Sequence, residues 1–301
     1  MHATNTTTPL AGAQQSTGSD IAVGVPMYIR ERALTNLLNS VPEYVSTVYV
    51  ADNGPDQDRD CYAREWPFDV DVLHLPVDCG IGQCRAAITD ALEERYLWLG
   101  DCDMEFVREG DPRILRSVLE RNPDLGAVAG WLVEDDVVRA GARDLAVHGD
   151  TVVKTAAEPA VECGPVPFSR WEFIPQCALF RSECFDAYDY DPDMAGSEHV
   201  DFFYGHKQHS DWEFASTPAV MIKHNRNINE AYRNDERGTD HASLELLHKK
   251  WGFSYIAPGT RPDWGFVRGR SLPEQAFDVF RRAAPPRVWI PTKRTLEGVL
   301  K

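Results

Sequence analysis

The sequence predicts an α/β fold with a mainly parallel sheet flanked by helices. Between residues 21 and 135, short and almost continuously apolar runs alternate with helical stretches. Strands with this composition are buried on both faces, which is typical of parallel sheets. The chain has 301 residues and is 43% hydrophobic, enough for a sizeable core in one large domain or two small ones.

The first half gives the clearest pattern. The apolar runs IAVGVPMY, VSTVYVADNG and DVDVLHLP are rich in β-branched residues and end at Pro, Gly or Asn, as strands do. Between them, ERALTNLLNSV and GIGQCRAAITDALEER carry apolar side chains at helical spacing. The expected elements are strands at 21–28, 45–54, 69–76, 95–104 and 125–135, and helices at 31–41, 80–95 and 111–123.

After about residue 136 the regular alternation of strands and helices ends. Short strands with Gly turns are expected over 137–156 and a longer strand over 172–181. A helix is expected over 197–212, a final strand over 217–225 and a further helix over 241–252. Residues 1–19 are rich in Thr, Gly, Gln and Ser and predict a flexible tail, while the last fifty residues give little pattern.

Composition excludes several classes of protein. The net charge of −16 would repel the phosphate backbone of a nucleic acid. No run of about 18 apolar residues is present, so no transmembrane segment is expected, and the polar first residues do not resemble a secretory signal. The seven cysteines lack C-x-x-C spacing, which fits reduced thiols and a cytoplasmic protein.

Asp101-Cys102-Asp103 is the strongest local signal for chemistry. The chain contains six D-x-D triplets, but only this one directly follows a buried hydrophobic strand, YLWLG. Two carboxylates at the end of a strand are costly without a partner, and a cation is a natural one. Oxygen ligands favour Mg²⁺ or Mn²⁺, ions that often bridge a diphosphate. A solvated loop after the strand is the alternative.

Four segments in order resemble the family 2 glycosyltransferases and their relatives with the GT-A fold. They are VGVPMYIRERALTNLLNSV, VYVADNG, GIGQCRAAITDAL and YLWLGDCDM. The resemblance covers about residues 20–230 and implies a nucleotide-sugar transferase. It implies a single GT-A-like domain over 20–301, with a nucleotide-sugar-binding half at 20–135, an acceptor half at 136–250 and a C-terminal extension at 251–301.

The resemblance also implies roles for the donor site. Pro26 and Tyr28 would line the base or ribose pocket, Asp52 would accept a hydrogen bond from the base, and Asn53 would shape that turn. Arg85 would face the nucleotide or diphosphate. One departure is Ile29, where many members carry Asn.

The implied metal site holds Mn²⁺ or Mg²⁺. Asp103 would bind the ion directly, and Asp101 would touch the ribose or the ion. His224 follows the strand AVMIK and resembles the late histidine that completes the metal site in many GT-A enzymes. A histidine at the surface end of a strand is the alternative.

The segment Gly196–Phe202 (GSEHVDF) resembles the part of galactosyl- and N-acetylhexosaminyltransferases that holds the catalytic base of inverting members. Asp201 or Glu198 could remove the proton of the acceptor hydroxyl, and His199 could do so near neutral pH. His199 stands where inverting members usually have Asp and retaining ones can have Asn, so base and stereochemistry stay open. A helix start capped by Ser197 is the structural alternative, and compatible with catalysis. Trp171 is a candidate platform for an acceptor sugar, although tryptophans are more often part of the core.

The sequence therefore predicts a metal-dependent glycosyltransferase that moves a hexose or N-acetylhexosamine from a UDP-sugar to an acceptor hydroxyl, with inversion. Alternatives are a retaining enzyme, a sugar nucleotidyltransferase, or a non-catalytic sugar-binding relative. VPMYIRER is not the Gly-rich phosphate loop that opens nucleotidyltransferases, and the intact Asp101 and Asp103 disfavour a non-catalytic protein. The acceptor could be a carbohydrate, a lipid-linked sugar or a protein. The Arg-containing stretches at 261–270 and 280–287 leave contact with a membrane surface open.

Overall fold

The computed structural model describes residues 20–135, 137–155, 160–225, 241–257, 263–264, 288 and 290–291. The predicted flexible tail at 1–19 and almost all of the Arg-containing stretches lie outside the described residues. Among the described residues, no helix combines the length and apolar character that crossing a membrane requires. The division of the domain into a donor half and an acceptor half stays a prediction.

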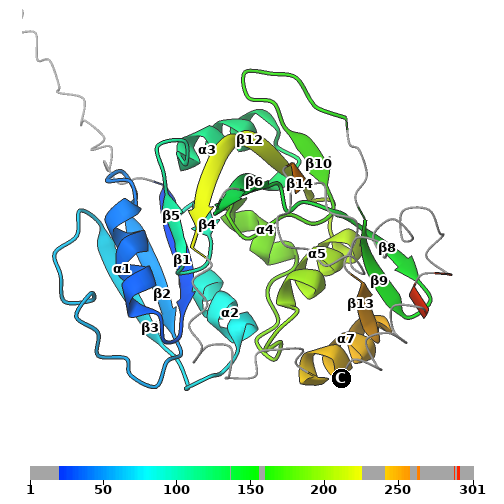
Figure 1. The fold of residues 1–301 in the computed structure, drawn as a ribbon, viewed down its shortest axis with the longest axis horizontal. Helices are drawn as coiled ribbons and strands as arrows, with labels where there is room; N and C mark the ends of the chain where they lie inside the picture. Colours follow the sequence, from blue (N-terminus) through cyan, green and yellow to red (C-terminus); the bar gives the residue numbers. More distant parts are fainter. Residues whose placement is uncertain are drawn as a thin grey trace, which may run out of the picture.

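A large sheet crosses the molecule, with eleven strands among the described residues (Figure 1). Its main path runs β10-β12-β6-β11-β4-β1-β2-β3, and β5, β7 and β14 pair beside this path. The strands are β1 (Ile21–Met27), β2 (Thr47–Asp52), β3 (Asp69–His74), β4 (Tyr96–Leu99), β5 (Met104–Phe106), β6 (Leu125–Glu134), β7 (Val137–Arg139), β10 (Ser169–Trp171), β11 (Ala178–Arg181), β12 (Glu213–His224) and β14 (Asp263–Trp264).

The remaining elements are a small second sheet and the helices. The small sheet has the order β13-β9-β8. Its strands are β8 (Asp144–His148), β9 (Thr151–Thr155) and β13 (Tyr255–Ala257), and the helices are α1 (Glu31–Ser40), α2 (Ile81–Ala91), α3 (Pro112–Arg121), α4 (Ser182–Ala187), α5 (Glu198–His209) and α7 (His241–Trp251).

The large sheet separates two hydrophobic cores because neighbouring strand residues point to opposite faces. Val23 and Val25 of β1 face a core that also holds apolar residues of α1 and α3. Ala22 faces the other core, which holds residues of α2, α4, α5 and α7. This alternation explains why the strands read as continuous apolar runs. It confirms the predicted α/β class with helices on both faces of a sheet.

The sheet is mixed, whereas the sequence predicted a mainly parallel one. β1, β2, β3 and β4 are parallel to one another, as expected. β11 is inserted antiparallel between β4 and β6, and β10, β5 and β7 also pair antiparallel. The apolar character of β11 shows burial on both faces and carries no information about direction.

Three further expectations are corrected. The strand expected over 172–181 exists only from Ala178, because Pro175 cannot take part in a ladder. β12 begins at Glu213 and is followed by β13 and β14, so it is not the final strand. The short helix α4 was not expected, since its six residues are too few to show a helical period.

Candidate active site

The carboxyl ends of four strands lie at one edge of the large sheet. β1, β4, β6 and β12 run in the same direction, because β11 is antiparallel to both of its neighbours and β12 is parallel to β6. His224, the last residue of β12, is paired with Met104 directly after the Asp101–Asp103 triplet. Ligands of α/β proteins bind at such an edge, so the topology gathers the predicted residues where a site is expected (Figure 1).

Asp103 is the centre of one charged cluster at this edge. Its carboxylate pairs with Arg30, which follows β1, and one of its oxygens lies 3.4 Å from Nε2 of His224. The other ring nitrogen of His224 lies 2.8 Å from a carboxylate oxygen of Glu134, at the end of β6. The structure thus brings together the predicted Asp103 and His224 and adds Arg30 and Glu134.

The protonation of this cluster follows from its charges. Burial opposes the charged forms, but His224 and Arg30 outweigh it and hold the pKa of Asp103 below its usual range. Burial alone would lower the pKa of His224. Hydrogen bonds and charge from Asp103 and Glu134 outweigh burial and raise this pKa to about 9. Without a further cation, Asp103 is therefore ionised and His224 protonated at neutral pH.

Arg85 forms the second cluster and joins α2 to two acids. Its fully buried guanidinium donates to Glu198 over 2.5 Å and to Asp101 over 3.1 Å. It also lies over the ring of Tyr190, 5.6 Å from the centroid. The guanidinium of Arg85 is thus already paired with two acids, whereas the resemblance implies that it faces the donor. A direct contact between Arg85 and the donor stays a prediction, and the visible contacts are those of a residue that positions Asp101 and Glu198.

His199 lies next to this cluster in the first turn of α5. The preceding Ser197 occupies the cap position with a left-handed backbone, φ 60°, and its hydroxyl makes no cap hydrogen bond, in contrast to the expected side-chain cap. The His199 side chain is 29% exposed as a whole, but its Nε2 is buried. This nitrogen lies 3.1 Å from a carboxylate oxygen of Glu198 and makes no hydrogen bond among the described residues.

The surroundings of His199 keep its imidazole neutral. Its ring meets the edge of Phe173 at 6.2 Å, and the ammonium of Lys154 lies 4.0 Å from the centroid of the same Phe173 ring. Burial first, and then the charges of Arg85 and Lys154, hold the pKa of His199 well below its usual range. The imidazole is therefore unprotonated at physiological pH, and the same burial and charges oppose its uptake of a proton.

Asp201 has other partners than Glu198, which lies three residues before it on α5. Its carboxylate is 1% exposed and accepts hydrogen bonds from Lys250 (2.7 Å), Trp251 (2.7 Å) and Tyr188 (3.1 Å). These contacts join α5 to α7. Catalysis by Asp201 stays a prediction, and its observed contacts hold two helices together.

The residues predicted around the nucleotide base lie at the ends of β1 and β2. Asp52 is fully buried and accepts from Arg59 (2.7 Å), Tyr62 (2.6 Å) and the backbone N–H of Gly54 (2.8 Å). Its oxygens therefore already have donors from its own loop. Asn53 is also buried beside it, at 2% exposure. Contact of these two residues with a base stays a prediction.

Pro26 and Tyr28 frame the same turn. Pro26 lies in β1 beyond the point where β4 ends, since the last pair between these strands is Gly24 with Leu99. This position tolerates a residue without a backbone donor. The carbonyl of Tyr28 accepts from Arg59 over 2.6 Å, and both side chains are partly exposed. A role in donor binding stays a prediction for each.

Trp171 is not brought to this edge. β10 and β12 are antiparallel, and Trp171 is paired with Phe214 near the start of β12, whereas His224 is the last residue of that strand. The two positions are separated by ten residues, or about 30 Å along an extended strand. Trp171 instead lines a separate pocket, together with residues of α5.

Four residues near the site were missed by sequence reasoning: Arg30, Glu134, Lys154 and Phe173. Glu134 carries the signal that selected Asp101, an acid at the end of a buried strand, and could have been found. Lys154 and Phe173 lie in short segments without a regular pattern, so no comparable signal marks them. The described residues contain no group of three or more His, Cys, Asp or Glu side chains that could hold a metal ion.

Comparison with known proteins identifies the fold. GalNAc-T7, solved with UDP, GalNAc and Mn²⁺, is similar with a TM-score of 0.57 and 14% identity, over 76% of this chain and 47% of that one. S. aureus TarS 1-349 in complex with UDP-GlcNAc is similar with a TM-score of 0.54 and 14% identity, over 76% and 64%. The fold is that of the GT-A-type glycosyltransferases. No protein-family model and no curated protein matches the chain in sequence.

Proposed function

We propose that the chain is a glycosyltransferase that moves a hexose or N-acetylhexosamine from a UDP-sugar to an acceptor hydroxyl. One observation carries the proposal: on a GT-A-type fold, the Asp101–Asp103 turn, His224 and the first turn of α5 converge at one sheet edge. The similar GalNAc-T7 and TarS structures contain UDP or UDP-GlcNAc, which supports UDP as the nucleotide.

His199 is the residue best suited to act as base. Asp201 is enclosed by three donors, and Glu198 is buried in its pair with Arg85. The His199 side chain is partly exposed and neutral, and because its Nε2 is buried, Nδ1 would be the nitrogen that takes the proton. Its imidazole would take the proton of the acceptor hydroxyl while that oxygen bonds to the anomeric carbon. The bond from this carbon to the diphosphate oxygen breaks, UDP leaves, and the direct displacement inverts the configuration.

Asp103 and His224 suit a divalent ion that takes its other ligands from the donor, since the described residues offer no group of three protein ligands. One Asp103 oxygen and Nε2 of His224 lie 3.4 Å apart, and Glu134 holds the opposite ring nitrogen, as carboxylates do behind metal-binding histidines. Asp103 and His224 would hold Mn²⁺ or Mg²⁺, with Asp101 next to them. Two protein ligands suit an ion that also binds phosphate oxygens. When bound, it neutralises charge on the leaving diphosphate.

Calorimetric titration of UDP into the full chain, with Mn²⁺ and then with EDTA, tests donor binding. We expect a dissociation constant between about 1 μM and 1 mM that weakens strongly without the ion. Absence of binding under both conditions, with GDP and CTP also failing to bind, would overturn the proposal.

Hydrolysis of UDP-sugars and transfer to added sugars test the role of His199. In His199→Ala we expect turnover to fall by about 10²- to 10⁴-fold while UDP binding is unchanged. His209→Ala is the matched control, since His209 lies on the same helix at its exposed end. Equal turnover in wild type and His199→Ala would remove His199 as the base.

A further inference from the structure

Arg30 places a positive charge where the proposed function expects a metal ion. It lies between β1 and α1, and its guanidinium pairs with one carboxylate oxygen of Asp103. The other oxygen of Asp103 lies 3.4 Å from Nε2 of His224. Metal–ligand bonds of about 2.1 Å place neighbouring ligands of an octahedral ion about 3 Å apart, so this oxygen and this nitrogen are spaced to share an ion. Asp103 therefore has two alternative cationic partners, the arginine and a divalent ion.

The backbone of Arg30 is fixed, whereas its side chain is able to change partner. Arg30 directly precedes α1, and its carbonyl accepts from the backbone N–H of Leu34 over 3.0 Å. The side chain is 17% exposed, and a long arginine can turn its charged end to water while its stem stays in place. The Asp103 side chain is more buried, at 8% exposure. Of the two, Arg30 is thus the residue that can leave the pair.

The guanidinium of Arg30 opposes an ion on Asp103. The two oxygens of a carboxylate share one carbon, so an ion on one oxygen lies within a few ångströms of a cation on the other. Charges at such distances in a partly buried site interact more strongly than they do in water. Arg30 also already balances the charge of Asp103. An ion by itself therefore gains less from Asp103 than it would from a carboxylate that faces no arginine.

A diphosphate relieves this opposition because it brings negative charge to both cations. Phosphate oxygens are ligands that Mn²⁺ or Mg²⁺ takes together with one or two protein groups. Arginine pairs as readily with phosphate as with carboxylate, so Arg30 has a new partner when it leaves Asp103. The ion and the nucleoside diphosphate then strengthen each other's binding, by the same factor in each direction.

We propose that Arg30 competes with the divalent ion for Asp103, so that the ion is held strongly only together with a nucleoside diphosphate. Without the donor, Arg30 stays on Asp103, orients this carboxylate and opposes ion binding. This inference rests on the proposed glycosyltransferase function, because Asp103 and His224 are the metal ligands of that proposal.

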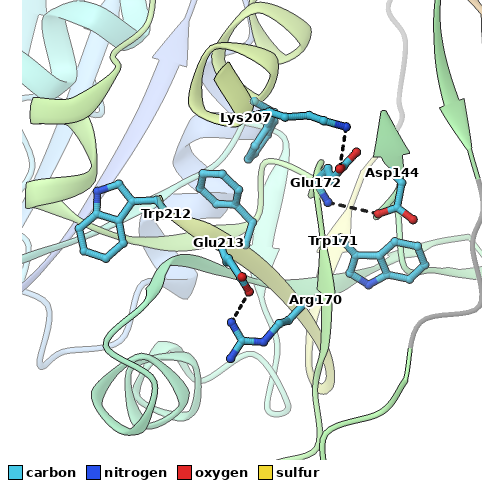
Figure 2. Close-up of a pocket in the computed structure, with 9 residues that line it drawn as sticks. Asp144, Arg170, Trp171, Glu172, Lys207, Trp212 and Glu213 are labelled. Atoms are coloured by element: carbon cyan, nitrogen blue, oxygen red, sulfur yellow. Dashed lines mark hydrogen bonds and ion pairs between the residues drawn. The ribbon is translucent and has the colours of Figure 1, made fainter. Parts of the chain in front are cut away.

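Arg170 is an arginine of the same sheet that serves as the comparison. It lies in β10 and pairs with Glu213 at the start of β12, whereas His224 ends that strand (Figure 2). It also pairs with Glu162 over 2.5 Å and with Asp124 over 2.6 Å. The side chains of these three acids are between 42% and 53% exposed, so water already solvates them. Removal of Arg170 should therefore not improve the binding of an ion.

Titration of Mn²⁺ into the full chain, followed by the electron paramagnetic resonance signal of the unbound ion, measures the competition. Without UDP, we expect Arg30→Gln to bind Mn²⁺ about tenfold more tightly than the wild type does. With saturating UDP the difference should disappear, so the factor by which UDP strengthens ion binding falls about tenfold. Arg30→Lys keeps the charge and should behave like the wild type. Arg170→Gln is the matched control and should leave Mn²⁺ binding unchanged.

Thermal melting checks that each variant folds, and Arg30→Met replaces Arg30→Gln if the glutamine variant does not. Adding Asp103→Asn to Arg30→Gln should abolish the gained binding, which locates the ion at Asp103. The inference is overturned if Arg30→Gln binds Mn²⁺ alone no more tightly than wild type, if Arg170→Gln gains as much, or if the gain survives loss of Asp103. Ion-dependent UDP binding by the wild type still upholds the transferase in those cases. Absence of UDP binding by the wild type, with and without Mn²⁺, would contradict the transferase and with it the role of Arg30.

Discussion

Asp52 and Asp103 are two buried carboxylates that stand at or beyond the ends of parallel strands, and they differ in where their partners come from. Asp52 accepts from Gly54, Arg59 and Tyr62, all within ten residues of it. Asp103 contacts Arg30, 73 residues before it, and His224, which ends β12. A carboxylate enclosed by its own loop stabilises that loop, whereas one shared by several strand ends can exchange a partner for a ligand. The same acid after a strand can therefore serve either the fold or the chemistry.

The largest effect on activity is expected at Asp103. Asp103→Asn keeps the shape of the side chain and removes the charge that would hold an ion and face Arg30. We expect turnover of UDP-sugar to fall by roughly 10³-fold, as for the loss of one strong electrostatic contact in an active site. The variant should still fold, because Arg30 is partly exposed and can be solvated. Full activity of this variant at saturating Mn²⁺ would show that Asp103 is not part of the site.

For Asp52, we expect the same kind of substitution to lower stability rather than turnover. Asp52→Asn leaves the buried guanidinium of Arg59 without its anion, which costs about 3–5 kcal/mol of unfolding free energy. Urea denaturation of the variant and the wild type measures this loss. A variant that unfolds like wild type but binds UDP poorly would instead support the base-binding role that the resemblance implies for Asp52.

Asp201, on the same helix as His199, is a third buried carboxylate whose partners lie elsewhere in the chain. Because three donors from α7 and Tyr188 meet its carboxylate, Asp201→Asn should lower the unfolding free energy by about 2 kcal/mol. The folded fraction should keep turnover within a few-fold of wild type, in contrast to His199→Ala. If Asp201→Asn melts normally and is inactive, Asp201 is the base and His199 is not.

The smallest effect is expected at Lys154 and shows as a shift in pH dependence. Burial, only partly offset by Glu198, lowers the pKa of Lys154 to about 8, so it is charged at neutral pH and disfavours the protonated form of His199. Lys154→Met removes that charge and raises the pKa of His199. The acidic limb of kcat/KM should then move to higher pH by up to about one unit.

Lys154→Arg keeps the charge and should leave that limb in place. An unshifted limb in Lys154→Met would mean that the lysine does not act on the group that titrates. A shift to lower pH would contradict the proposal, because loss of a nearby positive charge raises the pKa of a histidine and of a carboxylate alike.

The fold of the first 135 residues was predictable because its strands and helices depend on local patterns. Strands at 21–27 and 47–52 and the helix at 31–40 lie where apolar spacing placed them. The later half was less predictable, since β11 enters the sheet between two strands made earlier in the chain. Direction and neighbour in a sheet are set by the whole chain, and a short apolar run does not encode them.

The candidate site was predictable to a similar degree. Asp103 and His224 lie close together, and Arg85 joins Glu198 to Asp101, while the roles that the resemblance implies for them stay predictions. The sequence did not reveal that Asp201 accepts from Lys250 and Trp251 of α7, since these contacts join residues 49 and 50 positions apart. Nor did the sequence indicate that Arg30 pairs with Asp103, since that contact joins residues 73 positions apart.

The insertion of β11 between β4 and β6 also bears on how the protein is made. Until residues 178–181 leave the ribosome, the apolar strands YLWL of β4 and LGAVAG of β6 each lack the neighbour that separates them in the sheet. At cellular rates of synthesis the segment between β4 and β11 takes roughly 5–15 s to appear. During that time the unpaired edges can join other chains, as uncovered strands do. Growth of the chain through Arg181 therefore ends the interval in which β4 and β6 lack the strand that separates them.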